Sequence, residues 1–554
     1  MASWFLWIAL AVFVARELWR NIPPWMQRQL VPARILRRSA APASETDPPQ
    51  QSSGGGDSAR AQGGRGVADM TSLATLAGKL SSLFNLATEK LRLECDVGED
   101  GEAKEPKGMD AAFLILMRLL RRIKKEAPQT RDDEFCEGAE EDKVAEVRDV
   151  HEALEGMDKL FELADWAYDE WPEEHEVEGL ERKDGTGEPA DDGKCRATCL
   201  RDALRGIDMD LLRHEKIALP GCVAHYVALD QKQKLAIVAV KGTSSLEDLL
   251  TDCCGVAVTE ILPGPFAPSS PTEIRCHDGI LTASKRLASD LTALVEDLLL
   301  PAGYKIVITG HSLGAGVAAL VGILLRASLP ALEKSPPDAL KVVAFASPPI
   351  LDHAAAEACR DFCTTVVNQA DVIPRSSLAN LAVLRSVLAH AVRPRMVERG
   401  LMPEDFGSAG AFLQHLVDGD DKEKEWFMTP EEIRTAIAEA LAKVPIEDPE
   451  HLYVPGTVFL LYNSWAKETA DAEAAEASSD GKEKIEAADP PAHGVLRLSP
   501  AARLLRCVEL DLRMVLDHLS TAYRSSLREL LRGGAGCATG EGDPLPGSAP
   551  ALDG

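Results

Sequence analysis

The chain has 554 residues, of which 45% are hydrophobic and 27% charged, so it is long and apolar enough to bury a large core. Its 60 Lys and Arg residues are outnumbered by 88 Asp and Glu residues, and the net charge of −28 argues against nonspecific binding to nucleic acid. The twelve cysteines do not form Cys or Cys/His sets with zinc-site spacing, so no structural zinc is expected.

The N-terminal segment has the pattern of a membrane anchor. Residues 4–15 (WFLWIALAVFVA) form an uninterrupted apolar run, and arginines follow it. The run is shorter than the roughly 20 residues of a spanning helix, but Leu18 and Trp19 extend it. We predict an uncleaved anchor over 1–20, with the rest of the chain in the cytosol because the positive charges lie after the apolar run. A cleavable signal peptide is the alternative, favoured by the shortness of the apolar core.

Two further segments precede the body of the chain. Residues 21–70 are first basic and then rich in Pro, Gly, Ser and Gln, which is typical of a flexible linker. Residues 71–149 are predicted to be a helical extension with helices near 71–93 and 109–126. The second helix carries an apolar stripe ahead of a basic RRIKK end, a pattern that fits core packing, a partner helix or a membrane-surface helix. Core packing is preferred because apolar helical stripes are usually buried.

The body of the chain alternates helices with strands. Expected strands lie at 224–230, 235–241, 305–309, 341–346, 363–368 and 452–462, and expected helices at 147–168, 279–299 and 314–328. Strands separated by helices predict a mostly parallel sheet flanked by helices. We assign this domain to 150–532, with 466–492 as a disordered acidic insertion and 533–554 as a disordered tail.

The strongest chemical signal is the segment Gly310-His311-Ser312-Leu313-Gly314, which lies between a predicted strand and an Ala- and Gly-rich helix. This is the pattern of the nucleophile elbow, in which a serine sits on a sharp turn from strand to helix. The turn needs small neighbours because strand and helix approach closely, which explains the glycines. The sequence therefore predicts an α/β hydrolase with Ser312 as its nucleophile.

An oxyanion hole is predicted from two backbone N–H groups. The expected strand 235–241 ends in Gly242-Thr243-Ser244, a turn that can aim its N–H groups at a tetrahedral intermediate. We assign the hole to the N–H groups of Thr243 and of Leu313, the residue after the nucleophile. Taken without the elbow, the same KGTSS segment reads equally well as an ordinary turn.

The acid and the base must follow the serine, because the chain order in this fold is Ser, Asp, His. Asp371 comes directly after the expected strand 363–368, whereas Asp352 and Asp361 lie on a helix-like stretch, so Asp371 is the predicted acid. The base should follow the last core strand, which leaves two histidines: His493 and His518. His493 ends the acidic insertion, so His518, in the segment MVLDHLSTAY, is preferred and His493 is the alternative.

Several further motifs occur in the same order as in one family: WAYDE, VKGTSSLEDLLTD, HDGILTAS, ITGHSLGAG, AFASPP, VVNQADVIPR and DHLSTAY. On these motifs residues 150–530 resemble the lipase class 3 family, and within it the sn-1-specific diacylglycerol lipases. The resemblance implies hydrolysis of an acyl ester of a glycerolipid by Ser312, His518 and Asp371. No metal site and no cofactor are expected, with calcium dependence as the alternative. Two features depart from the pattern. The diacylglycerol lipases with long N-termini carry four spanning helices where this chain has one short apolar run, and Lys241 replaces the usual Arg of the RGT motif on the oxyanion strand.

An anchor beside a basic segment also favours a lipid substrate, because it concentrates the enzyme where insoluble esters lie. Residues 256–275 and 395–430 are candidate lids, with ordinary surface loops as the alternative. Glycerolipid and membrane are thus the expected partners, while protein partners are not predicted. A phospholipase A1 or acyltransferase of the same fold, and a catalytically silent lipase-like scaffold, are the alternative functions.

Overall fold

A computed structural model describes the parts of the chain that are discussed below. These are residues 96–97, 103–104, 108–127, 154–168, 199–216, 223–242, 255–262, 273–333, 335–406, 411–412, 425–448, 450–463, 493–508, 510 and 512–533. The predicted anchor, linker, helix 71–93 and acidic insertion lie outside them, as does the predicted tail except Gly533, the last residue of a helix. No helix within these ranges is both long and apolar enough to cross a bilayer.

The chain divides into two compact units. The larger comprises Leu83–Met396 and Glu425–Gly554 and holds the sheet and all the predicted site residues that the structure describes. The smaller comprises Met1–Ser82 and Val397–Lys424. Its described part includes the short helix η5 (Pro403–Phe406), where Phe406 packs edge-on against Phe412 with ring centroids 5.4 Å apart.

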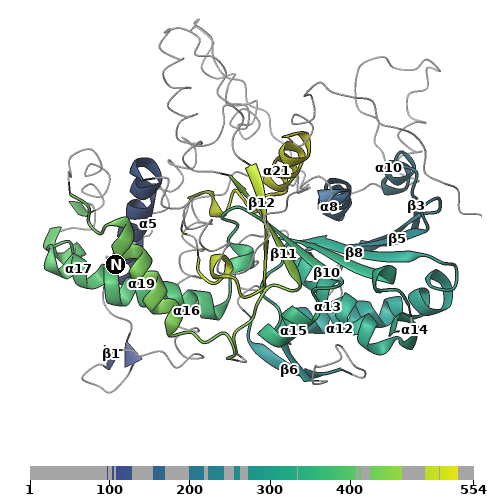
Figure 1. The fold of residues 1–554 in the computed structure, drawn as a ribbon, viewed down its shortest axis with the longest axis horizontal. Helices are drawn as coiled ribbons and strands as arrows, with labels where there is room; N and C mark the ends of the chain where they lie inside the picture. Colours follow the sequence, from purple (N-terminus) through teal and green to yellow (C-terminus); the bar gives the residue numbers. More distant parts are fainter. Residues whose placement is uncertain are drawn as a thin grey trace, which may run out of the picture. The chain divides into compact units, whose positions relative to one another are not determined.

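The larger unit is built on an eight-stranded sheet with the order β12-β11-β10-β9-β8-β5-β4-β3 (Figure 1). The strands are β3 (Asp210–Glu215), β4 (His225–Asp230), β5 (Leu235–Val240), β8 (Lys305–His311), β9 (Leu340–Phe345), β10 (Cys363–Asn368), β11 (Thr457–Asn463) and β12 (His493–Leu498). The five strands from β5 to β11 in the sheet order pair in parallel, and β3, β4 and β12 are antiparallel to their neighbours. The predicted parallel centre is confirmed.

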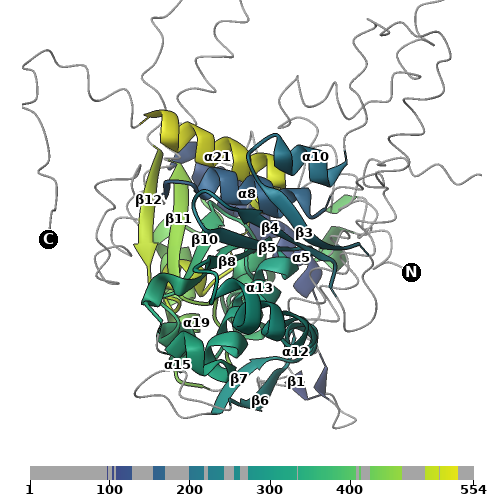
Figure 2. The same cartoon turned by 90° about the vertical axis from the view of Figure 1, so that its right-hand side faces the viewer.

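Helices cover both faces of the sheet. α8 (Met157–Trp166) and α21 (Ser520–Gly533) lie over one face, and α12 (Asp278–Ala293) and α13 (Leu313–Ser328) over the other (Figure 2). A three-layer arrangement of this kind buries central strands on both sides, which is why they read as continuous apolar runs in the sequence. The architecture is that of an α/β hydrolase.

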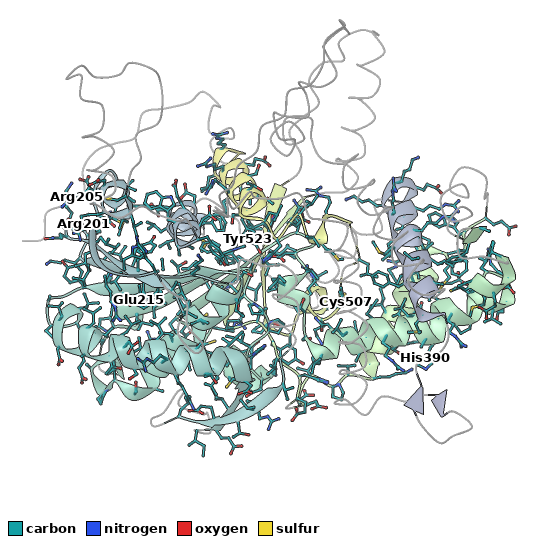
Figure 3. All side chains as sticks on the ribbon, turned by 180° about the vertical axis from the view of Figure 1, so that it is seen from behind. Arg201, Arg205, Glu215, His390, Cys507 and Tyr523 are labelled. Carbon is teal, nitrogen blue, oxygen red and sulfur yellow. The ribbon has the colours of Figure 1, made fainter. Side chains whose placement is uncertain are left out.

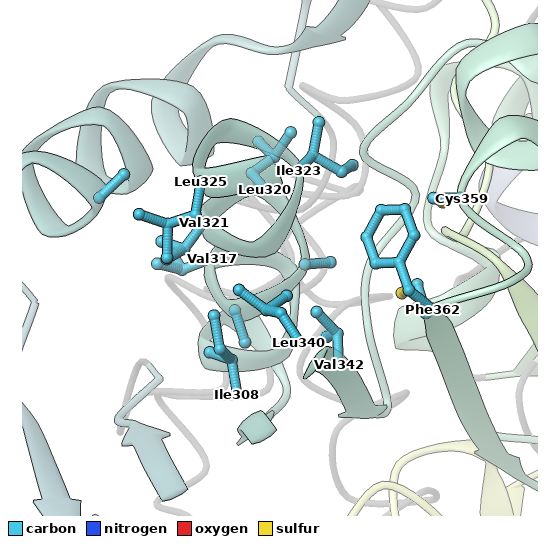
Figure 4. Close-up of a cluster of buried hydrophobic side chains, with 14 of the residues drawn as sticks. Ile308, Val317, Leu320, Val321, Ile323, Leu325, Leu340, Val342, Cys359 and Phe362 are labelled. Atoms are coloured by element: carbon cyan, nitrogen blue, oxygen red, sulfur yellow. The ribbon is translucent and has the colours of Figure 1, made fainter. Parts of the chain in front are cut away.

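The core beneath α13 explains the small residues of that helix. Val317, Leu320 and Val321 of α13 are buried together with Leu340 and Val342 of β9 (Figure 4). A Cβ added at Gly322 would lie 2.4 Å from a methyl carbon of Val342, so the helix approaches β9 too closely for any side chain there. This close packing holds α13, which begins directly after the predicted nucleophile, against the sheet.

The described residues also form shorter elements and further helices. They are β1 (Asp96–Val97), β2 (Ala103–Lys104), α5 (Met109–Glu126), α10 (Leu200–Arg205), β6 (Ala257–Ile261), β7 (Glu273–His277), η1 (Leu294–Leu299), α14 (Pro330–Glu333), η2 (Pro337–Ala339), α15 (His353–Ala358), η3 (Ile373–Arg375), α16 (Leu378–Val387), η4 (Leu388–Val392), α17 (Arg393–Glu398), α19 (Pro430–Ala442), η7 (Arg503–Leu505) and η8 (Leu512–Met514). α5 confirms the helix expected at 109–126, and the stripe that includes Leu116 and Leu119 is buried, as in core packing. α5 packs beside η4.

The structure differs from two predicted elements, and backbone geometry explains both differences. The helix expected at 147–168 is interrupted between Leu154, which is helical, and α8, because Gly156 has a φ of 71°, while residues 147–153 lie outside the described residues. β11 begins at Thr457 rather than at 452, because Gly456 has a φ of 79° and turns the chain into the strand. The prediction also missed β12, which starts at His493, directly after the expected insertion.

The first candidate lid, residues 256–275, has a regular structure at its two ends. β6 and β7 form an antiparallel hairpin, and residues 263–272 between them lie outside the described residues. Arg275 of β7 donates a hydrogen bond to the backbone oxygen of Ala257 at 3.2 Å and forms an ion pair with Glu450. The residues of the second candidate, 395–430, are described only in part.

Candidate active site

Ser312 lies on the turn between β8 and α13. Its φ of 62° and ψ of −131° lie in a region that a residue with a side chain adopts only under strain. Its N–H donates a hydrogen bond to the backbone oxygen of Phe345 on β9 at 2.8 Å, which fixes the turn to the neighbouring strand. The strand, sharp turn and helix that a nucleophile elbow requires are therefore present.

The two predicted elbow glycines are required by the same close approach. A Cβ on Gly310 would lie 2.6 Å from the backbone carbon of Gly314, and one on Gly314 would lie 2.4 Å from the backbone oxygen of Val240. Backbone atoms cannot move aside as the end of a side chain can. The elbow therefore leaves room only for hydrogen at these positions.

The structure brings the predicted nucleophile, base and acid together. Nε2 of His518 is 3.0 Å from Oγ of Ser312, and Nδ1 of His518 is 3.0 and 3.1 Å from the two carboxylate oxygens of Asp371. Asp371 follows β10, and His518 lies in the loop between η8 and α21. His518, rather than the alternative His493, occupies the position between Ser312 and Asp371.

Asp371 is fully buried and is surrounded by donors. Besides His518, the hydroxyl of Tyr523 donates to it at 2.7 Å and the N–H of Ile373 at 2.9 Å. Burial alone would raise the pKa of Asp371, but the charge of His518 and these hydrogen bonds outweigh it and hold the pKa below its ordinary value. The carboxylate is thus ionised and available to orient and stabilise a charged imidazole.

The acid loop and the loop that carries His518 are joined by hydrogen bonds that the sequence did not predict. The Asn368 side chain donates to the backbone oxygen of Asp517 at 3.0 Å, and the N–H of Ala370 donates to the Asp517 carboxylate at 3.2 Å. The N–H of Val372 donates to the backbone oxygen of Met514 at 3.2 Å. The motifs VVNQADVIPR and DHLSTAY contain the donors and Asp517, but neither motif identifies which residues meet.

Arg375, the last residue of VVNQADVIPR, holds the acid loop from the other side. Its buried guanidinium donates to the backbone oxygen of Asp371 at 2.8 Å and to that of Leu504 at 3.1 Å. The side chain of Asn380 donates to the backbone oxygens of Arg375 and Leu505, at 2.9 and 2.7 Å. The position of Asp371 therefore depends on contacts with residues more than 120 positions away.

Only part of the predicted oxyanion hole is described. Leu313 is the first residue of α13, where a backbone N–H has no acceptor within the helix, while Thr243 lies outside the described residues. Gly242, at the end of β5, is so close to the elbow that a Cβ on it would lie 2.8 Å from the backbone oxygen of His311. The hydroxyl of Tyr168, from the motif WAYDE, donates to that same oxygen at 2.8 Å.

No group of three or more His, Cys, Asp or Glu side chains that could hold a metal ion occurs among the residues that the structure describes.

Comparisons with known proteins identify relatives of the region that carries the elbow. Residues 237–381 match the family described as Lipase (class 3). Diacylglycerol lipase-beta of Mus musculus is 34% identical over 179 residues, which cover 30% of this chain and 24% of that protein. Diacylglycerol lipase-alpha of Homo sapiens is 30% identical over 187 residues, covering 31% of this chain and 16% of that protein.

More distant likenesses include a fungal lipase and a solved structure. The lipase of Rhizopus niveus is 30% identical over 110 residues, which cover 20% of this chain and 26% of that protein. The native propeptide complex of Rhizomucor miehei lipase is 19% identical, covers 42% of this chain and 64% of that chain, and has a TM-score of 0.30. The chain spans less than a quarter of the length of the two diacylglycerol lipases.

Proposed function

We propose that this protein, whose residues 237–381 match the class 3 lipase family and which is similar to the diacylglycerol lipases, is a serine hydrolase that cleaves acyl esters of glycerolipids. One observation carries the proposal: His518 is within hydrogen-bonding distance of both Oγ of Ser312 and the carboxylate of Asp371. A serine hydroxyl is a weak nucleophile until an oriented base accepts its proton, and this geometry supplies such a base.

Acylation follows from these positions. Oγ of Ser312 attacks the ester carbonyl while its proton moves to Nε2 of His518, and Asp371 stabilises the resulting imidazolium through Nδ1. The negative charge that develops on the carbonyl oxygen is met by the N–H of Leu313 at the positive end of α13, with the N–H of Thr243 as the second proposed donor. His518 then donates its proton to the leaving alcohol, and the acyl group stays on Ser312.

Deacylation repeats the sequence with water. His518 accepts a proton from a water molecule as the hydroxide attacks the acyl-serine, a second tetrahedral intermediate forms, and its collapse releases the fatty acid and restores Oγ–H of Ser312. An alcohol in place of water would make the product a new ester. The molecule that accepts the acyl group, water or an alcohol, therefore distinguishes a lipase from an acyltransferase of the same fold.

The preferred substrate in this proposal is a diacylglycerol cleaved at sn-1, giving a monoacylglycerol and a free fatty acid. The similarity to the two diacylglycerol lipases supports this choice over other glycerolipids. Association with a membrane through residues 1–20 is part of the same proposal, with the catalytic domain on the cytosolic side. The apolar run and the arginines after it support this part.

The test uses the purified full-length chain with a panel of diacylglycerol, triacylglycerol and phosphatidylcholine, followed by product analysis. Diacylglycerol should release fatty acid from sn-1, and Ser312→Ala should lower the rate by at least about 10⁴-fold, as loss of a nucleophile does in serine hydrolases. Ser328→Ala, an exposed serine at the far end of the same helix, is the matched control and should keep the wild-type rate.

Three outcomes would redirect the proposal. Wild-type rates in Ser312→Ala would refute the mechanism. Preferred hydrolysis of phosphatidylcholine, or new esters in the presence of an alcohol, would make the protein a phospholipase or an acyltransferase. Failure of a fluorophosphonate probe to label folded wild-type protein at Ser312 would indicate a silent scaffold.

A further inference from the structure

His311 contacts the proposed base in two ways. It is the last residue of β8, directly before Ser312, and it is buried. Its imidazole stacks on that of His518 with ring centroids 4.8 Å apart and an interplanar angle of 27°. Its Nε2 is also 3.0 Å from the backbone oxygen of His518. One side chain thus touches both the ring and the main chain of the same residue.

We propose that His311 is a positioning residue, which holds the imidazole of His518 in line between Ser312 and Asp371. This inference rests on the proposed function of the site. The stacked ring limits rotation of the His518 ring about its Cβ–Cγ bond, and the hydrogen bond fixes the backbone from which that ring projects. Rotation of the ring would lengthen the contacts to Ser312 and to Asp371 at once, because the two nitrogens lie on opposite sides of it.

His311 is itself held on several sides. Phe161 and Tyr523 meet its ring edge-on, with centroids 5.8 and 5.5 Å away, and Tyr168 does so at 6.0 Å. The Tyr168 hydroxyl also donates to the backbone oxygen of His311. Phe161 and Tyr168 precede residues 237–381, so the support for this histidine includes a helix outside the region that matches the lipase family.

The contact also fixes which ring nitrogen of His311 carries a hydrogen. A backbone oxygen only accepts hydrogen bonds, so Nε2 of His311 must carry the hydrogen. The titratable groups that face His311 are His518, Asp371, Tyr168 and Tyr523. Burial above all, and then the charge of His518, lower the pKa of His311 to about 3, although Asp371 acts in the opposite direction. His311 is therefore neutral when His518 takes up the serine proton, and it does not repel the new charge.

Two substitutions separate the two contacts. His311→Phe keeps a flat ring for stacking and loses the N–H, whereas His311→Gln keeps an N–H donor and loses the ring. His390 supplies the matched controls, because this exposed histidine also has a ring nitrogen 3.0 Å from a backbone oxygen, that of Ser386, outside the site (Figure 3). His390→Phe and His390→Gln should behave as wild type.

The measurements are kcat, KM, thermal unfolding, and the rate and final extent of fluorophosphonate labelling. In both His311 variants we expect kcat to fall about 10- to 100-fold, since misplacement of a catalytic group by about 1 Å can cost about 10²-fold. KM should stay within about twofold, because the substrate does not contact His311 in this proposal. Labelling should be slower by a similar factor but should reach the same final extent.

The outcomes distinguish this inference from the proposed function. If the wild type neither labels nor hydrolyses esters, the proposed function fails; if it does both and the two variants keep kcat within about twofold, the positioning role fails. If a smaller fraction of a variant is labelled, but the labelled fraction reacts at the wild-type rate, His311 acts in folding only. This result would also refute the inference. If neither variant folds, the wild type decides: NMR of the histidine rings should show a proton on Nε2 of His311 that is protected from exchange, and a freely exchanging proton would refute the contact with His518.

Discussion

Replacing Tyr523 by Phe removes one oxygen atom from the centre of the site. The hydroxyl donates to the carboxylate of Asp371 at 2.7 Å and accepts the N–H of Asn368 at 3.0 Å. The ring is fully buried and stacks on Phe161 with centroids 5.6 Å apart, a contact that Phe preserves. The substitution therefore tests the hydroxyl and leaves the packing in place.

Two interactions are lost together. The Asn368 N–H would be buried without its acceptor, which costs about 1–3 kcal/mol, and a hydrogen bond to an ionised carboxylate contributes about 1.5–3 kcal/mol. Asp371 retains His518 and the Ile373 N–H, so we expect a net loss of about 2–4 kcal/mol in the free energy of unfolding. The pKa of Asp371 should rise, because a donor to its charged form is gone, and kcat should fall about tenfold.

Urea unfolding and steady-state hydrolysis measure the two effects. Tyr453→Phe is the control, because Tyr453 is also buried and donates to a backbone oxygen, that of Ile446 at 3.0 Å, but is not part of the site. It should lose about 1 kcal/mol and keep its kcat. A Tyr523→Phe variant that unfolds within about 0.5 kcal/mol of the wild type with full activity would refute the described hydrogen bonds.

Two other predictions concern stability. Burial and the charge of His518 lower the pKa of His311 from an ordinary 6.5 to about 3. Between these pH values the unfolded chain binds a proton at His311 that the folded chain does not bind. The free energy of unfolding should therefore fall as the pH drops from about 6.5 towards about 3. Urea midpoints over this window should fall less steeply in His311→Phe, and equal slopes would contradict the argument. Gly314→Ala should destabilise the fold by about 1–3 kcal/mol, because its Cβ would meet backbone atoms. Gly279→Ala is the control and should be neutral, because the nearest atom is 3.8 Å from the added Cβ. Equal melting temperatures of the two variants would contradict this prediction.

Much of the sheet could be predicted because its determinants are local. Central parallel strands such as β5 and β8 are buried on both faces and appear as continuous apolar runs. The elbow is equally local, because Gly310 and Gly314 are required by atoms within a few residues or on the adjacent strand. Asp371 and His518 could be chosen because the fold expected around the elbow requires the chain order Ser, Asp, His. Their chemical roles remain predictions.

The supports of the site could not be predicted because their partners lie far away in the chain. Tyr523 bonds to Asp371 across 152 positions, and Asn368 bonds to Asp517 across 149. Periodicity shows which face of an element is buried but not what it meets. A usable signal exists for Tyr523 alone: it lies five residues after His518, in the first turn of the helix that follows, so it can point back to the same site.

The sheet itself explains why the base must come from a distant loop. Ser312 follows β8 and Asp371 follows β10, and one parallel strand, β9, lies between them. Neighbouring strands are about 4.8 Å apart, so the two side chains start about 10 Å from each other, too far for a direct hydrogen bond. A single imidazole with a contact of 3.0 Å at each nitrogen bridges this gap. Since that imidazole projects from a loop, the geometry of the site depends on the contacts that hold the loop. Asn368, Asp517 and His311 make these contacts.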